Sequence, residues 1–221
     1  MQRRIGFLLC VGFALVVALS ACDLVSNEPD TCEGEGTLFE DEFNGERDCG
    51  WATYNRSGAT VAINDGALQI STSQPGQIWW SNPGKNFDDQ VITAEARQVD
   101  GPDDNAYGII CRYQNEENFY LFLVSGDGYY AIGKYQSGND EVQYLTEDNQ
   151  FQPSDAINQG DATNRIEASC IGNELRLAVN GLSLLTVSDP TFVTGDIGLA
   201  ASTLQPGTSL IEFDNIRVRL P

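Results

Sequence analysis

Alternation of apolar and polar side chains runs through most of the chain and is clearest between residues 105 and 135. Three segments there, 106–114, 119–125 and 129–136, are rich in aromatic and aliphatic residues. They are separated by short turns at 115–118 and 126–128, and Asp-Gly in the second turn supplies the positive φ angles that short hairpin loops need. The pattern predicts a three-stranded antiparallel meander. Because both faces of its strands are largely apolar, we expect them to lie centrally in a sheet that is covered on both sides.

The same kind of pattern predicts about fourteen short strands in all, with no convincing helix, no internal repeat and no second domain. A long polar loop is expected at 147–163. Residues 37–221 are therefore predicted to form one all-β domain, an antiparallel β-sandwich or jelly roll. The strands expected outside the meander are 51–55, 60–64, 67–72, 77–81, 91–98, 141–146, 164–171, 174–179, 182–189, 197–201 and 209–220.

The first 21 residues have the organisation of an export signal. Arg3 and Arg4 precede an apolar run, 5–19, which ends in Leu-Ser-Ala before Cys22. This ending resembles the lipobox of bacterial lipoproteins, which implies cleavage of residues 1–21 and lipidation of Cys22. The expected location is the outer face of the bacterial cytoplasmic membrane, with the lipid as the membrane anchor. An uncleaved transmembrane helix is the alternative, although the apolar run is short for a full span.

Residues 22–36 are predicted to be the lipidated N-terminus and a polar tether. In bacteria with two membranes, Asp23 resembles a signal for retention at the inner membrane. Without residues 1–21 the chain has ten basic and 32 acidic residues, a net charge of −22. This charge argues against nucleic acid as a partner, because the phosphates would be repelled. The absence of histidine excludes Ser-His-Asp and Cys-His nucleophile systems and the usual zinc sites.

Four cysteines remain in the predicted mature chain beyond Cys22, and an even number in an exported protein indicates two disulfides. Three pairings are possible. We expect Cys32 to pair with Cys49, which closes a local loop at the start of the domain. Cys111 and Cys170 lie in the middle of predicted strands on inward faces, and we expect them to pair with each other. The alternative is that Cys111 or Cys170 is free and buried.

Short motifs follow one another in a characteristic order along the domain. They are FEDEF at 39–43, GW at 50–51, AYGIICRY at 106–113, NFY at 118–120, LRLAVNG at 175–181, GDIGL at 195–199 and FDNIRV at 213–218. Together they resemble the concanavalin A-like jelly-roll superfamily, in particular its laminin-G-like and 3-keto-disaccharide hydrolase (DUF1080) modules. The resemblance implies two apposed, curved antiparallel sheets, with the concave face as the usual carbohydrate site. Because this superfamily includes lectins, binding modules and glycosidases, the fold does not determine the function.

Aromatic rings can stack on the apolar faces of sugars, while polar groups bind the hydroxyls. In the alternative interpretation, the tyrosines cover the rim of the core with their hydroxyls in water. Adjacent residues of a strand point to opposite faces, so at most one of two neighbouring tryptophans should belong to a given site. The candidate ligand-binding residues are Trp79, Trp80, Arg112, Tyr120, Tyr129, Tyr130 and Lys134.

A retaining glycosidase needs two carboxylates about 5 Å apart. The predicted central strands carry only Glu95 and Glu167, and neither has a second acid two residues away. We therefore expect no catalysis, and interpret the domain as a binding module for extracellular glycan. A protein-interaction or scaffold domain of the cell envelope is the first alternative, and a glycoside-processing hydrolase is the second.

The resemblance also implies a structural calcium ion that joins the two ends of the domain. Glu40 or Glu42, near the first strand, and Asp214, in the last, would supply carboxylates to a shell of six to eight oxygen ligands. Alternatively, Asp214 caps a turn or binds a backbone amide. No other cofactor is expected.

Overall fold

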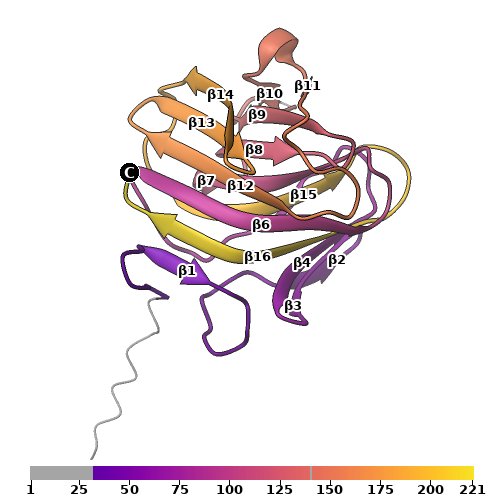
Figure 1. Cartoon of the computed structure of the whole chain (residues 1–221), viewed down its shortest axis with the longest axis horizontal. Helices are drawn as coiled ribbons and strands as arrows, with labels where there is room; N and C mark the ends of the chain where they lie inside the picture. Colours follow the sequence, from indigo (N-terminus) through magenta and orange to yellow (C-terminus); the bar gives the residue numbers. More distant parts are fainter. Residues whose placement is uncertain (1–31, 140) are drawn as a thin grey trace, which may run out of the picture.

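The computed structural model describes residues 32–139 and 141–221, and the predicted signal peptide, with Cys22, lies outside them. The described chain forms two antiparallel β-sheets that pack face to face (Figure 1). This arrangement confirms the predicted all-β sandwich. In this part of the chain, no helix is long and apolar enough to cross a bilayer.

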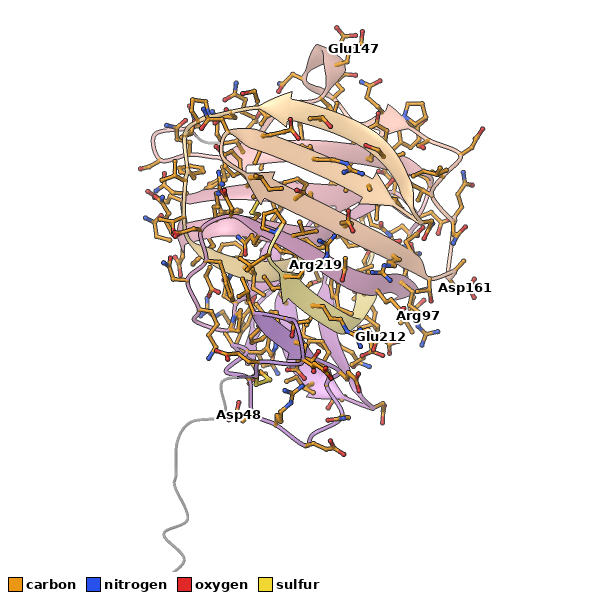
Figure 2. The ribbon with its side chains drawn as sticks, turned by 60° about the vertical axis from the view of Figure 1, so that its left-hand side comes forward. Asp48, Arg97, Glu147, Asp161, Glu212 and Arg219 are labelled. Carbon is orange, nitrogen blue, oxygen red and sulfur yellow. A yellow bond between two sulfur atoms is a disulfide. The ribbon has the colours of Figure 1, made fainter. Side chains whose placement is uncertain are left out.

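One sheet has nine strands among the described residues. They are β1 (Phe39–Asp41), β2 (Tyr54–Arg56), β3 (Ala59–Asn64), β4 (Ala67–Thr72), β6 (Gln90–Asp100), β12 (Asn164–Ile171), β13 (Glu174–Val179), β14 (Leu182–Ser188) and β16 (Ser209–Arg219). Their order is β14-β13-β12-β6-β16-β4-β3-β2, and β1 also pairs with β16. The outer face is polar: Arg97 of β6 forms a 2.6 Å ion pair with Glu212 of β16 (Figure 2).

The other sheet has seven strands in the same described ranges. They are β5 (Trp79–Ser81), β7 (Asn105–Asn115), β8 (Asn118–Val124), β9 (Tyr129–Tyr135), β10 (Gln143–Tyr144), β11 (Gln152–Pro153) and β15 (Asp196–Thr203). Their order is β10-β9-β8-β7-β15-β5, and β11 also pairs with β9. The predicted meander is β7-β8-β9, in the middle of the sheet. The expected loop after residue 147 contains β11 and one 3-10 turn, Glu147–Asn149.

Strand β8 shows how the two faces of this sheet differ. Tyr120 and Phe122 point into the core between the sheets, whereas Phe119, Leu121 and Leu123 point to the outer face. All five are at most 2% exposed. The outer face is therefore covered by a second apolar cluster, which extends to partly buried rings such as Trp80, and this cluster is where a ligand site can form.

Both predicted disulfides are present. Cys32 pairs with Cys49, and Cys111 pairs with Cys170. The second bridge joins β7 of one sheet to β12 of the other through the core, and both of its cysteines are fully buried. It is thus a covalent link between the two layers of the sandwich.

Candidate functional site

A β-bulge near the end of β7 determines which side chains reach the outer face. The pairing of β7 with β8 shifts between Cys111 and Asn115, and Arg112 has a φ of 54°. Strict alternation would place Arg112 beside Ile110 on the outer face, with Tyr113 in the core. The bulge reverses this order, so that Arg112 is fully buried and Tyr113 packs against the outer cluster.

Arg112 therefore does not contribute to a ligand site on the outer face, contrary to the hypothesis from the sequence. Its Nη1 donates hydrogen bonds of 2.8 Å to the carbonyl oxygens of Gly172 and Phe192. Its Nη2 lies 3.1 Å from a carboxylate oxygen of Asp89. These contacts attach β7 to the β12–β13 turn and to the loop after β14, which is a structural role.

Tyr120 and Lys134 are also turned inward, opposite each other on β8 and β9. Lys134 Nζ lies 2.7 Å from Asp189 Oδ2, and the Tyr120 hydroxyl donates a 2.6 Å hydrogen bond to Asp189 Oδ1. Burial, together with the hydrogen bond to Asp189, raises the pKa of Tyr120 to about 12. Burial would raise the pKa of Asp189, but hydrogen bonds from Lys134, Thr191 and Tyr120 lower it to about 2. Both candidates are thus bound to a buried carboxylate and do not face a ligand.

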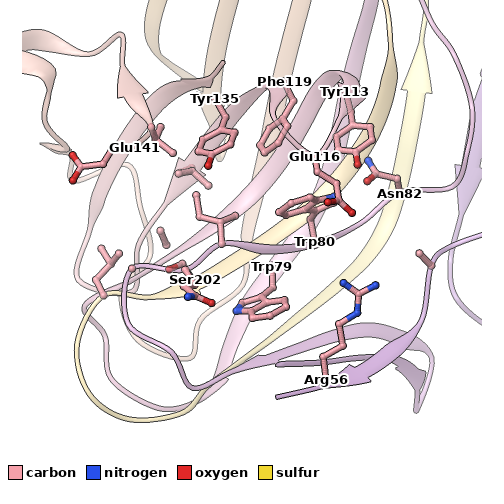
Figure 3. Close-up of a pocket in the computed structure, with 18 of the residues that line it drawn as sticks. Arg56, Trp79, Trp80, Asn82, Tyr113, Glu116, Phe119, Tyr135, Glu141 and Ser202 are labelled. Carbon is pink, nitrogen blue, oxygen red and sulfur yellow. The ribbon is translucent and has the colours of Figure 1, made fainter. Parts of the chain in front are cut away.

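The outer face of the seven-stranded sheet carries a row of four aromatic rings, one each from β5, β7, β8 and β9. Ring centroids lie 5.3 Å apart between Trp80 and Phe119, 5.6 Å between Tyr113 and Phe119, and 5.5 Å between Phe119 and Tyr135. Phe119 is buried in the middle, while the other three are partly exposed (Figure 3). The four rings line a cavity of about 780 Å³.

Polar side chains complete the lining of this cavity. Arg56 of β2 and Glu116 of the β7–β8 turn lie on the Trp80 side of the aromatic row, and Glu141 lies on the Tyr135 side (Figure 3). Burial raises the pKa of the Tyr113 hydroxyl, so this group stays protonated near neutral pH and can donate a hydrogen bond. The cavity therefore combines apolar ring faces with donors and acceptors.

Both adjacent tryptophans line the cavity, although the sequence predicts only one. Trp80 packs against the outer cluster and Trp79 against the core between the sheets, as alternation requires. However, β5 is the edge strand of its sheet, and the cavity continues around this edge to Tyr54 of β2. The Tyr54 hydroxyl donates a 2.9 Å hydrogen bond to the Trp80 carbonyl oxygen, which connects the two sheets at this edge.

Tyr129 and Tyr130 do not line the cavity. Tyr129 is 39% exposed, and Tyr130 packs against the core between the sheets. The residues that sequence reasoning missed are Tyr113, Phe119 and Tyr135. Alternation along β8 places Phe119 on one of its two apolar faces. Pairing across the β8–β9 hairpin could then have placed Tyr135 opposite Phe119. No local signal indicated Tyr113, because its direction depends on the bulge.

The three candidate calcium ligands each have another partner in the structure. Glu40 and Glu42 each form a long ion pair with an arginine, at 3.7 and 3.6 Å. Asp214 Oδ1 accepts a 2.7 Å hydrogen bond from the backbone N–H of Asn215. Over residues 32–139 and 141–221, no three Cys, Asp or Glu side chains are grouped so that they could hold a metal ion.

Calcium binding stays a prediction of the resemblance, and thermal unfolding tests it. If the ion joins the two ends of the domain, calcium raises the melting temperature and Asp214→Ala abolishes this gain, because a carboxylate ligand is lost. An unchanged melting curve in excess chelator would assign these acidic residues to the solvated surface.

Residues 38–219 match the model of a family described as the 3-keto-alpha-glucoside-1,2-lyase-like domain. No curated protein matches the sequence significantly. The carbohydrate binding module CBM66 from Bacillus subtilis superimposes with a TM-score of 0.62 and 16% identity, covering 77% of this chain and 95% of that chain. A Bacillus licheniformis β-glucanase superimposes with a TM-score of 0.59 and 9% identity, covering 83% and 98%. A GH16 protein of Bacteroides ovatus in complex with product superimposes with a TM-score of 0.57 and 13% identity, covering 82% of this chain and 99% of that chain.

At these identities the solved structures share the fold with this chain, and they confirm the concanavalin A-like jelly roll expected from the sequence. The family model, in contrast, matches the sequence itself over most of its length, including all the strands of both sheets. The chain therefore belongs to the 3-keto-alpha-glucoside-1,2-lyase-like domain family.

Proposed function

We propose that the domain binds extracellular carbohydrate in the cavity on the outer face of the seven-stranded sheet, without cleaving it. The observation that carries this proposal is the row formed by Trp80, Tyr113, Phe119 and Tyr135. Ring faces of this kind pack against the C–H faces of sugars, and the polar groups around them can bind hydroxyls. The volume of about 780 Å³ is in the range of small-ligand sites. A binding module and glycosyl hydrolases of the same fold support a carbohydrate ligand.

The arrangement of carboxylates supports binding without hydrolysis. Among the described residues that line the cavity, the only acids are Glu116 and Glu141. Figure 3 shows Glu116 beside Trp80 and Glu141 beyond Tyr135, so that the rings of Phe119 and Tyr135 lie between the two acids. Glycosidase carboxylates flank one bond, about 5–5.5 Å apart in retaining enzymes and about 6.5–9.5 Å apart in inverting enzymes. Two acids separated by a row of rings do not form such a pair.

Carbohydrate processing is a second candidate, favoured by the lyase named in the family description. Elimination from a 3-keto-glucoside requires one base, because the ketone acidifies the neighbouring C–H group. Glu116, beside Trp80, would supply this base (Figure 3). In this mechanism the base removes the proton next to the ketone, the electrons of the C–H bond form a C=C bond, and the glycosidic oxygen leaves with the electrons of the broken C–O bond and takes up a proton.

Binding and turnover can be tested together on a panel of oligosaccharides that includes 3-keto-α-glucosides. We expect Trp80→Ala to weaken glycan binding at least about tenfold, because the platform loses its largest ring. Tyr129→Ala, which removes an exposed ring outside the cavity, should leave the affinity unchanged. Calorimetry measures the affinity, and product analysis measures turnover. Turnover that Glu116→Gln abolishes would contradict binding without catalysis, and equal affinities for Trp80→Ala and wild type would contradict the location of the site.

We also propose that the domain is attached to the outer face of the cytoplasmic membrane through a lipid on Cys22. The lipobox-like sequence supports this attachment, and the two disulfides are typical of an extracytoplasmic compartment. Cys22→Ser is expected to leave the protein unprocessed or released from the membrane fraction. Fractionation with detection of the processed size measures the outcome. A Cys22→Ser protein that stays in the membrane at the normal processed size would contradict the anchor.

A further inference from the structure

We infer that the cavity selects sugar chains that carry an isolated carboxylate, as a uronic acid does, and that Arg56 binds this carboxylate. This inference rests on the proposed carbohydrate binding and adds the chemical class of the ligand. Arg56 is the only basic residue among the described residues that line the cavity.

Arg56 is a cation without an acidic partner. In the part of the chain that the structure describes, six basic residues form ion pairs, whereas Arg56, like Lys85, Arg165 and Arg176, has no carboxylate within 4.0 Å. Its guanidinium lies over the Tyr54 ring, with Cζ 4.7 Å from the ring centroid. The chain has 32 acidic residues against 12 basic ones, so a shortage of carboxylates does not explain why Arg56 has no ion-pair partner. The fold leaves the guanidinium, with its planar array of donors, free to bind an anion.

The position of Arg56 relative to the aromatic row is well defined. Arg56 ends β2, which is paired with β3, and Tyr54 on the same strand is hydrogen bonded to the Trp80 carbonyl oxygen. The Tyr54 ring also lies 6.4 Å from the Trp79 ring. Arg56 and Trp79 therefore both contact Tyr54 at the edge of the sheet, and Figure 3 shows them on the same side of Trp80. A sugar stacked on Trp80 would present a substituent at this edge to Arg56.

Trp79 supplies a second donor at this edge. Its indole Nε1 is buried and, within the described ranges, has no hydrogen-bond partner. A buried N–H without an acceptor is unfavourable, so an oxygen that reaches it lowers the free energy of the complex. Figure 3 shows this nitrogen at the end of the indole that is turned away from Arg56, so its acceptor is an oxygen of the sugar other than the carboxylate that binds Arg56.

The remaining charges restrict the ligand further. Glu116 lies beside Trp80 and repels a carboxylate, so among the described lining residues only the Arg56 guanidinium attracts one in this part of the cavity (Figure 3). The net charge of −20 repels a polyanion as a whole. Salt screens the repulsion from charges that are farther away than the Debye length, which is about 8 Å at physiological ionic strength. A single carboxylate next to Arg56 is therefore affected mainly by the attraction of the guanidinium. We therefore expect single uronates among neutral sugars and not continuous polyuronates.

The test compares oligosaccharides that carry one uronate with the same oligosaccharides after reduction of the carboxyl group to an alcohol, using calorimetry on the intact domain. We expect the acidic form to bind about tenfold more tightly, as for a charge-assisted hydrogen bond. Arg56→Gln should make the affinities for the two forms equal. Arg165→Gln is the matched control, since Arg165 is an exposed arginine that does not line the cavity.

The outcomes separate the inference from the proposed function. Binding of reduced and acidic forms with equal affinity, or a preference for acid that survives Arg56→Gln, would overturn the role of Arg56 and leave carbohydrate binding in place. Binding of neither form across the whole panel would overturn the proposed function, and the inference with it. An acid preference that Arg56→Gln removes and Arg165→Gln retains would establish both.

Discussion

Replacement of Asp189 by asparagine is expected to lower the free energy of unfolding by about 3–5 kcal/mol, the usual cost of removing one partner of a buried ion pair. The side chains of Lys134 and Asp189 are only 9% and 11% exposed, and their charged atoms lie 2.7 Å apart. Asp189 also accepts the hydrogen bond of the Tyr120 hydroxyl. In Asp189→Asn, the ammonium group of Lys134 is left buried without its counter-charge. Unfolding in urea at pH 7 measures the loss.

The pH dependence of this loss gives a second check. The pKa of Asp189 is lowered from 3.8 to about 2, so its stabilisation is fully present above the unfolded value and is lost as the pH falls towards 2. The difference in stability between wild type and Asp189→Asn should be constant from pH 7 to about 5 and should shrink below about pH 4. Asp161→Asn makes the same chemical change at an exposed position and should change stability little. A stability of Asp189→Asn within about 0.5 kcal/mol of wild type would contradict a structural role for the pair.

Removal of the Cys111–Cys170 bridge is the second change with a large expected effect, a loss of about 4 kcal/mol for the double alanine variant. The bridge closes a loop with a sequence separation of 59 residues, so without it the unfolded chain gains considerable conformational entropy. It also joins the two sheets through the core, where both cysteines are fully buried. Thermal or urea unfolding of the variant, with wild type under oxidising conditions as reference, measures the loss.

The other disulfide is the matched control. Cys32 and Cys49 have a sequence separation of 17, for which the same chain-entropy relation gives about 3 kcal/mol. The core bridge should therefore be the more stabilising of the two. If the Cys111 and Cys170 double alanine variant unfolds like wild type, the bridge does not stabilise the sandwich, and the packing of the two sheets is sufficient without it.

The aromatic site shows how much of a binding site a local sequence pattern can predict. The sequence makes Trp80 a candidate because aromatic rings can stack on the apolar faces of sugars. Phe119 and Tyr135 lie on strands whose bounds were predicted to within about one residue, yet their role was missed. Their partnership depends on the register between β8 and β9, in which Phe119 lies opposite Tyr135. A register is a relation between two segments, and neither segment specifies it alone.

The three candidates that proved to be buried were chosen for their polar groups, which usually point to water. Tyr120 and Lys134 find their partner in Asp189, which is 69 and 55 residues away in sequence. Arg112 binds carbonyl oxygens 60 and 80 residues away. A pattern of neighbouring residues contains no information about such distant acceptors, so the burial of these groups could not be read from it.

The sequence by itself determined the positions of most strands and the antiparallel class of the sandwich, because alternation and turn chemistry act over a few residues. It left three cysteine pairings open, and the structure has the expected one. The tertiary structure decided which face of each central strand meets the other sheet. Strands β7 and β8 are apolar on both faces, so alternation separates the two faces without saying which one is inside. Packing against the second sheet determined which face is inside. The bulge turned Arg112 inward and Tyr113 outward, and together these two features determined where the cavity lies.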